Sequence, residues 1–225
     1  MTIGKTRTII RAEIDTQYEI LSQMIEDIAD RYQEEALRFE QYIDKVAEEG
    51  SDGDRDIKFS IQRSFDDSLE KQYSLTFEAR KILFCAIFSY FESMLYGLIG
   101  YYMIPRGRTN QVGQLIDKIG EEYLRRYSKA LSFTSDTNVL SNFYRPLRNM
   151  YMHGHIGNPN DKKNLRSYLE KENRVDLVSG YCEIKSNTFL IDTLNIVNNC
   201  LVEIEEAYCK KRGNVIGEIV ESNKG

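Results

Sequence analysis

The side chains with the most chemical potential in this 225-residue chain lie close together in the sequence. Only two histidines occur, His153 and His155, and they follow Arg148 and Asn149 by a few residues. A histidine changes charge near neutral pH and can transfer protons, whereas a guanidinium binds phosphate oxygens through a planar pair of donors. This combination is suited to acid–base chemistry at a phosphate group and needs no metal ion.

Other catalytic and cofactor motifs are missing from the sequence. It has no HExxH pair, no EF-hand loop, no GxxxxGK[ST] or GxGxxG phosphate loop and no GxSxG elbow. The cysteines show neither CxxC spacing nor a zinc-binding spacing with the histidines; they are Cys85, Cys182, Cys200 and Cys209. No apolar leader segment is visible at the N-terminus. We expect no metal and no cofactor, and reduced thiols in a cytoplasmic protein.

Helical spacing leaves two choices for the histidine that acts with Arg148. At about 100° per residue, Asn149 and His153 share a helix face, whereas Arg148 and His153 diverge by about 140°. Arg148 and His155 would align if the helix continued through Gly154, but glycine at this place favours a helix end. His153 is therefore the preferred catalytic residue, and His155 remains the alternative.

A single charged residue, Glu92, interrupts the most apolar stretch of the chain, residues 82–104. The stretch is long enough for a membrane span, but a carboxylate near its middle would cost about 2.5–3.5 kcal/mol on insertion. We therefore expect a buried core helix and no membrane contact. Glu92 then either faces a groove or pairs with a cation, and a purely structural pairing with Arg148 is one alternative to catalysis.

The charges are distributed unevenly along the chain. The net charge is −5 overall, which does not indicate a nonspecific nucleic-acid binder. Residues 1–75 contain 10 basic and 18 acidic side chains, whereas residues 141–174 contain seven basic and three acidic ones and carry a net charge of +4. This asymmetry favours an anionic partner at the second segment. The expected contact residues are Arg145, Lys162, Lys163 and Arg166.

The N-terminal third has the pattern of a helical hairpin. Apolar residues recur in steps of four and three from Ile14 to Val46, with only Glu35 off the pattern, which predicts a coiled-coil seam. Glycines and small polar residues at 49–54 break this helix, and apolar residues spaced by four over 57–77 predict a returning antiparallel helix. The hairpin has a mainly structural role in this interpretation.

The rest of the chain predicts a helical bundle. Apolar spacing indicates core helices near 78–104, 110–131, 138–155 and 188–211, and a small strand pair is expected within 175–184. Pro146 either starts the third of these helices or kinks it. Gly213 is expected to end the last one. The predicted fold is an all-α, up-and-down bundle (residues 76–212) with a long N-terminal coiled-coil hairpin (residues 1–75) and a C-terminal tail (residues 213–225).

The segment from Arg148 to His153, Arg-Asn-Met-Tyr-Met-His, resembles the arginine, polar residue, three variable residues and histidine motif of the HEPN (higher eukaryotes and prokaryotes nucleotide-binding) superfamily. The apolar stretch FSYFESMLYGLI, residues 88–99, is similar to the first core helix of HEPN proteins in toxin and abortive-infection systems. About 150 residues share the resemblance, and the N-terminal hairpin does not.

The resemblance implies a metal-independent endoribonuclease with a HEPN-like bundle. Arg148 would bind the scissile phosphate, His153 would act as general base or acid, and Asn149 would orient the site, with His155 and Glu92 as further candidates. The implied partners are RNA, a second copy of the chain that completes the active site, and an antitoxin or defence-system protein. The alternative is a catalytically inactive scaffold that binds a partner through its coiled-coil hairpin.

Overall fold

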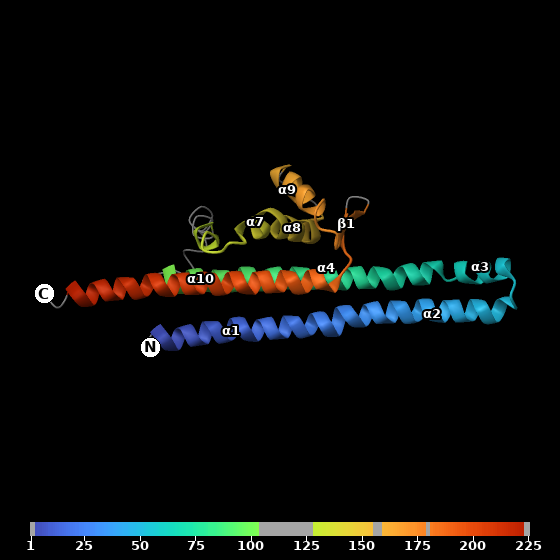
Figure 1. The fold of residues 1–225 in the computed structure, drawn as a ribbon, viewed down its shortest axis with the longest axis horizontal. Helices are drawn as coiled ribbons and strands as arrows, with labels where there is room; N and C mark the ends of the chain where they lie inside the picture. Colours follow the sequence, from blue (N-terminus) through green and yellow to red (C-terminus); the bar gives the residue numbers. More distant parts are fainter. Residues whose placement is uncertain (1–2, 104–127, 155–158, 179–180, 223–225) are drawn as a thin grey trace.

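The computed structural model describes residues 3–103, 128–154, 159–178 and 181–222. These residues are mainly helical and include one two-stranded sheet, so the predicted all-α fold class is confirmed. In Figure 1 the long helices lie side by side along the long axis of the molecule, and the shorter elements gather on one side of them.

The N-terminal arm is a nearly continuous helical rod. It consists of α1 (Ile3–Met24), the π-helical segment η1 (Ile25–Asp30) and α2 (Arg31–Ser51). Asp52 and Gly53 then adopt left-handed backbone conformations, with φ of 46° and 83°, and reverse the chain. Asp54 caps the next helix, because its carboxylate accepts hydrogen bonds from two backbone N–H groups of the first turn.

The π-helical segment η1 shifts the register of the buried side chains along this rod. A π turn holds one residue more than an α turn and so displaces the pattern that follows it. From the end of η1 onward, the buried residues stand one position beyond the predicted seam: Ala29, within η1, and then Ala36 and Ile43 of α2. Glu35, the one exception in the apolar pattern, consequently lies on the surface, where it pairs with Arg31 at 3.0 Å.

The returning arm consists of α3 (Arg55–Arg63) and α4 (Asp66–Met103), and it packs along α2 as predicted. Helix α4 runs without interruption through residue 75, where the hairpin was expected to give way to the bundle. Ile14 and Leu21 of α1 belong to the same apolar core as Phe84 and Phe88 of α4. The arm and the bundle therefore share one helix and one core.

A buried arginine fastens the arm to the bundle. Arg80 of α4 is only 4% exposed, and its three guanidinium nitrogens donate hydrogen bonds to Gln33 Oε1 (2.7 Å), Asn187 Oδ1 (2.7 Å) and the Ile184 carbonyl (3.3 Å). Burial lowers the pKa of Arg80, and the nearby Asp30 carboxylate opposes this shift. Three segments far apart in the sequence are thus joined at one cation.

The C-terminal helix α10 (Asn187–Ser222) packs against both α1 and α4. Its buried side chains form the apolar stripe predicted for 188–211, including Leu190, Leu194 and Leu201. The helix continues through Gly213, so the helix end expected there is not found. One glycine inside a helix costs about 1 kcal/mol, which does not stop a helix whose flanking residues are compatible with it.

The shorter elements form a layer on α4 and α10, on the side opposite α1 and α2 (Figure 1). They are α7 (Thr137–Val139), the π-helical segment η3 (Leu140–Tyr144), α8 (Arg145–His153), α9 (Pro159–Leu169), β1 (Val175–Val178) and β2 (Tyr181–Ile184). The strands pair antiparallel, with Val175 opposite Ile184, which confirms the expected strand pair. Helix α9 was not predicted. Most of the helix expected near 110–131 lies outside the described residues, and 128–131 are helical.

Helix α4 contains the one candidate membrane span found in the described residues. Its long apolar segment has a mean hydropathy of 1.7 in the best window, and half of that window is buried inside the protein. Phe84, Phe88 and Phe91 are fully buried, and Glu92 is half-buried. Such burial is typical of a core helix, whose apolar composition is the same as that of a membrane span.

Candidate functional site

The motif helix α8 begins at a wide turn and ends at a glycine. Arg145 donates its backbone N–H to the Leu140 carbonyl, five residues earlier, and Pro146 follows at the first turn of α8, where a missing N–H breaks no helical hydrogen bond. Pro146 therefore lies in the first turn of α8, directly after the π-helical segment η3, with helical backbone on both sides of it. Gly154 adopts a left-handed conformation (φ 70°) and donates its N–H to the Met150 carbonyl, so the expected helix end at Gly154 is confirmed.

A cluster of aromatic rings holds α8 against α4 and α10. Phe84 of α4 contacts Tyr144 and Tyr151 edge-on, with ring centroids 6.0 and 5.7 Å apart, and stacks on Phe189 of α10 at 5.9 Å. Phe84 and Phe189 are fully buried, and burial raises the pKa of Tyr144 to about 12. The motif helix is therefore fixed by packing on the scaffold of long helices.

Arg148 is anchored on two sides. Its Nη2 donates a hydrogen bond to Glu92 Oε2 and its Nη1 to Asn149 Oδ1, both at 3.0 Å. The side chains of Arg148 and Glu92 are 23% and 34% exposed, so the pair lies at the edge of the core. Arg148 Nε is buried and has no hydrogen-bond partner among the described residues. The cation that Glu92 was expected to require is Arg148.

His153 is the last residue of α8, and it is exposed. It stands about 140° around the helix from Arg148, whose guanidinium is turned toward α4. The helix does not continue through Gly154, which removes the alignment that would have favoured His155. His155 itself lies outside the described residues. Within one subunit, therefore, the motif arginine and His153 leave α8 in different directions.

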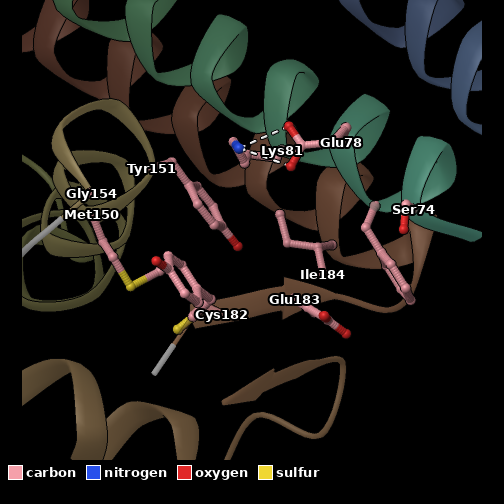
Figure 2. A pocket seen from close by; sticks show the side chains of 11 residues that line it. Ser74, Glu78, Lys81, Met150, Tyr151, Gly154, Cys182, Glu183 and Ile184 are labelled. Carbon is pink, nitrogen blue, oxygen red and sulfur yellow. Dashed lines mark hydrogen bonds and ion pairs between the residues drawn. The ribbon is translucent and has the colours of Figure 1, made fainter. Parts of the chain in front are cut away.

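A cavity of about 470 Å³ opens beside the end of this helix. It lies between α4, Gly154 and strand β2, and three aromatic residues, Phe77, Tyr151 and Tyr181, contribute to its walls. In Figure 2, Tyr151 points from α8 toward the space between α4 and β2, and the ion pair between Lys81 and Glu78 (2.8 Å) lies next to it. The cavity combines aromatic surfaces with a donor and an acceptor.

The Tyr151 hydroxyl is a feature of this region that the sequence did not point out. It is buried and has no hydrogen-bond partner among the described residues. Burial raises the pKa of Tyr151, so the hydroxyl keeps its proton at neutral pH. A buried hydroxyl without a partner costs about 1–3 kcal/mol. Such groups are uncommon in proteins, and a bound molecule is one way of satisfying them.

The thiols near the site are protonated and unreactive. Burial raises the pKa of Cys85, against the opposing positive charges of Arg148 and Lys81, and it raises the pKa of Cys182 to about 11. All four cysteines are free. Among the described residues no group of three or more histidines, cysteines or carboxylates could hold a metal ion. Nucleophilic thiol chemistry is therefore disfavoured here.

The structure sorts the basic residues of segment 141–174 into two groups. Arg148 is paired with Glu92, and Arg174 with Glu172 and Asp192, so their charges are compensated. The other group is exposed and has no carboxylate partner in the described part of the chain: the four predicted contact residues, Arg145, Lys162, Lys163 and Arg166, together with Lys171. On α9, Lys162, Lys163 and Arg166 lie within an arc of about 100° of the helix surface that borders the buried Leu165.

Sequence reasoning found the arginine, the asparagine, the exposed histidine and Glu92, because their residue types are unusual for their positions. It missed the cavity, whose walls come from residues 74–81, 150–154 and 181–184. The only local signal was a tyrosine inside the motif itself. Tertiary packing determines which faces of these three distant segments meet. The apolar periodicity of a single segment does not contain this information.

No protein-family model, no curated protein and no solved structure matches this chain. The candidate site therefore rests on its own residues and geometry.

Proposed function

We propose that this protein is a cytoplasmic, metal-independent endoribonuclease of the HEPN type, acting in a toxin–antitoxin or anti-phage abortive-infection system. One observation carries the proposal: the Arg148 guanidinium is held by Glu92 and Asn149 on a helix that ends at an exposed histidine, His153. A fixed cation and a nearby titratable base are the two groups that phosphodiester transesterification requires.

In the proposed reaction His153 accepts the proton of a ribose 2′-hydroxyl while that oxygen attacks the adjacent phosphorus. The bond from phosphorus to the 5′-oxygen breaks, and His153, now protonated, donates the proton it accepted to this leaving oxygen. Arg148 compensates the negative charge that accumulates on the phosphoryl oxygens. The products are a 2′,3′-cyclic phosphate and a 5′-hydroxyl, and DNA is not cleaved because it lacks the attacking hydroxyl.

The divergence of Arg148 and His153 on α8 supports a composite site in a homodimer. One subunit does not direct both side chains at the same phosphate, because Arg148 is turned toward α4 whereas His153 is exposed at the helix end. A twofold axis near α8 would bring the arginine of each subunit to the histidine of the other.

The surroundings of Arg148 suit a substrate that replaces part of its pairing. A guanidinium has five N–H donors, and Glu92 and Asn149 each accept one hydrogen bond in the structure. An RNA phosphate at this edge of the core would bind the remaining exposed donors. The unpaired cations on the adjacent surface, Arg145 of α8 and those of α9, are the expected contacts for neighbouring phosphates.

The deciding experiment is RNA cleavage by purified variants. His153→Ala is expected to lose about two to four orders of magnitude in rate while remaining folded, because general acid–base catalysis contributes that much. Arg148→Ala and Arg148→Lys should both be inactive, since a lysine does not reproduce bidentate phosphate binding. Activity should persist in EDTA. Arg38→Ala, which alters an exposed arginine of α2, is the matched control.

His155→Ala separates the two histidines, and a mild defect is the expected result. If the His153 and His155 variants both cleave RNA as the parent does, the nuclease proposal is wrong.

A scaffold function is the second candidate, and one observation favours it. The hairpin arm exposes several large apolar side chains: Leu37, Tyr42, Ile57 and Phe59. Phe59 is 65% exposed. Isolated apolar residues are common on surfaces, but binding of a helical partner would use such residues. In that case Arg148 and Glu92 are a structural ion pair only, and substitution of His153 changes nothing that the protein does.

A further inference from the structure

The cavity between α4, Gly154 and β2 is not used by the proposed chemistry, although it lies next to the catalytic helix. We propose that it binds a nucleobase of the RNA substrate. This inference rests on the proposed nuclease function for the source of the base, and on the geometry of the cavity for its chemistry. With a volume of about 470 Å³, it falls within the range of small-molecule sites.

The walls of the cavity suit a flat aromatic ring. Tyr181 of β2 lines it and is 66% exposed, and Phe77 of α4 lines it on the opposite element. An exposed tyrosine in a hollow is a stacking platform, because every base has a π-face that can rest on an aromatic side chain.

The polar groups of the cavity can read the edge of a base. Glu78 offers carboxylate oxygens and Lys81 offers N–H donors, and the two pair with each other at 2.8 Å. A base carries donors and acceptors side by side on one edge, which complements a neighbouring carboxylate and ammonium better than a purely apolar ligand would.

The position of the cavity connects it to the reaction. Gly154 lines the cavity, and His153 precedes it directly in the chain. Lys81 and Glu92 are eleven residues apart on α4, so they lie on nearly the same face of that helix, separated by about 16 Å. Glu92, which pairs with Arg148, and Lys81, at the edge of the cavity, thus both face the layer of shorter elements that contains α8 and β2. A nucleotide whose 2′-hydroxyl reaches His153 would have its base near the cavity.

Binding of mononucleotides to the full-length protein tests the chemistry. The probes are AMP, GMP, CMP and UMP, with ribose 5-phosphate as the ligand that lacks a base, and binding is measured by ligand-observed NMR. At least one nucleotide is expected to bind more tightly than ribose 5-phosphate. Tyr181→Ala should weaken this binding about tenfold, as expected for loss of a stacking platform, and Tyr181→Phe should retain it. Tyr42→Ala, which removes an exposed tyrosine outside the cavity, should bind as the parent does.

RNA cleavage then identifies the source of the base. We expect the parent to prefer certain bases next to the cleaved bond, and Tyr181→Ala to lose this preference while still cleaving. Mononucleotide binding with an unchanged preference would overturn the assignment to substrate RNA. Absence of any base-dependent binding would overturn the nucleobase site altogether. If RNA binds through Tyr181 but is never cleaved, the base site stands and only the nuclease proposal fails.

Discussion

At the scale of single residues, the meaning of Arg148 depends on its pairing with Glu92. The pair joins two helices across the edge of the core, with both side chains about one-quarter to one-third exposed. Such a position lies between a surface ion pair, which contributes little, and a buried pair, whose disruption is costly. The pair therefore has a measurable structural role that does not depend on the proposed nuclease function.

A double-mutant cycle on Arg148→Gln and Glu92→Gln measures this role. We expect a coupling free energy of about 1–2 kcal/mol in urea denaturation, because the hydrogen bond joins two charged and partly buried groups. The exposed pair Glu78 and Lys81 gives the matched cycle, with an expected coupling below about 0.5 kcal/mol. Equal coupling in the two cycles would show that Arg148 is no more firmly held than a surface cation.

The sequence could predict these residues because their types stood out locally. Glu92 is the one charge in an apolar stretch, and Arg148 and the histidines form a dense polar cluster. It could not decide between pairing and catalysis, because both roles need the same side chains. The sequence also gave no sign that the Tyr151 hydroxyl is buried without a hydrogen-bond partner among the described residues. Tyrosines are common in this chain, and most buried tyrosines form a hydrogen bond.

At the scale of elements, Arg80 decides how the N-terminal arm docks. Arg80→Leu is expected to lower the free energy of unfolding by about 2–4 kcal/mol, because the buried Ile184 carbonyl and the partly buried Asn187 lose their donor, and the link to Gln33 on α2 is lost as well. Arg80→Lys should recover only part of this loss, since one ammonium does not span three acceptors. Urea denaturation measures the effect.

The control for Arg80 is Arg38→Leu, which removes a surface pair with Glu34 and should change stability by less than about 0.5 kcal/mol. Equal stability of the two variants would mean that the docking depends on apolar packing alone.

The elements also show where periodicity is reliable and where it is not. The reversal at Gly53 and the helix end at Gly154 were predictable, because both glycines adopt left-handed backbone conformations that other residues disfavour. The register shift at η1 was not, because a π turn leaves no mark except the single mismatch at Glu35. Helix α9 was missed because it is short and polar, and Leu165 alone among its described side chains is buried.

At the scale of the whole molecule, buried cysteine and tyrosine side chains make the free energy of unfolding depend on pH in the alkaline range. Burial raises the pKa of Cys182 to about 11 and those of Cys200 and Tyr144 to about 12, above ordinary values of 9.0 for cysteine and 10.0 for tyrosine. In this range the unfolded chain loses protons that the folded protein keeps. The free energy of unfolding should therefore be highest below pH 9 and fall as the pH rises toward 12.

Urea denaturation at a series of pH values from 8 to 11 checks this dependence. Each group contributes at most about 1.4 kcal/mol per pH unit. In the Cys200→Ala variant the free energy of unfolding should fall less steeply with pH than in the parent, because one of the groups with a raised pKa is gone. An equally steep decline in this variant would mean that the thiol is not held in its neutral form.

The last question at this scale is whether one chain forms a complete active site. If Arg148 of one subunit acts with His153 of the other, Arg148→Ala and His153→Ala are each inactive as homodimers. A mixed dimer of the two variants, however, contains one site with both residues intact. Subunits that exchange at random form mixed dimers half of the time, and each mixed dimer has one intact site of two, so mixing should restore about one-quarter of the parental activity.

Light scattering must show a dimer under the same conditions. Two inactive variants that stay inactive when mixed, although they exchange subunits, would place both residues in one chain and contradict the composite site.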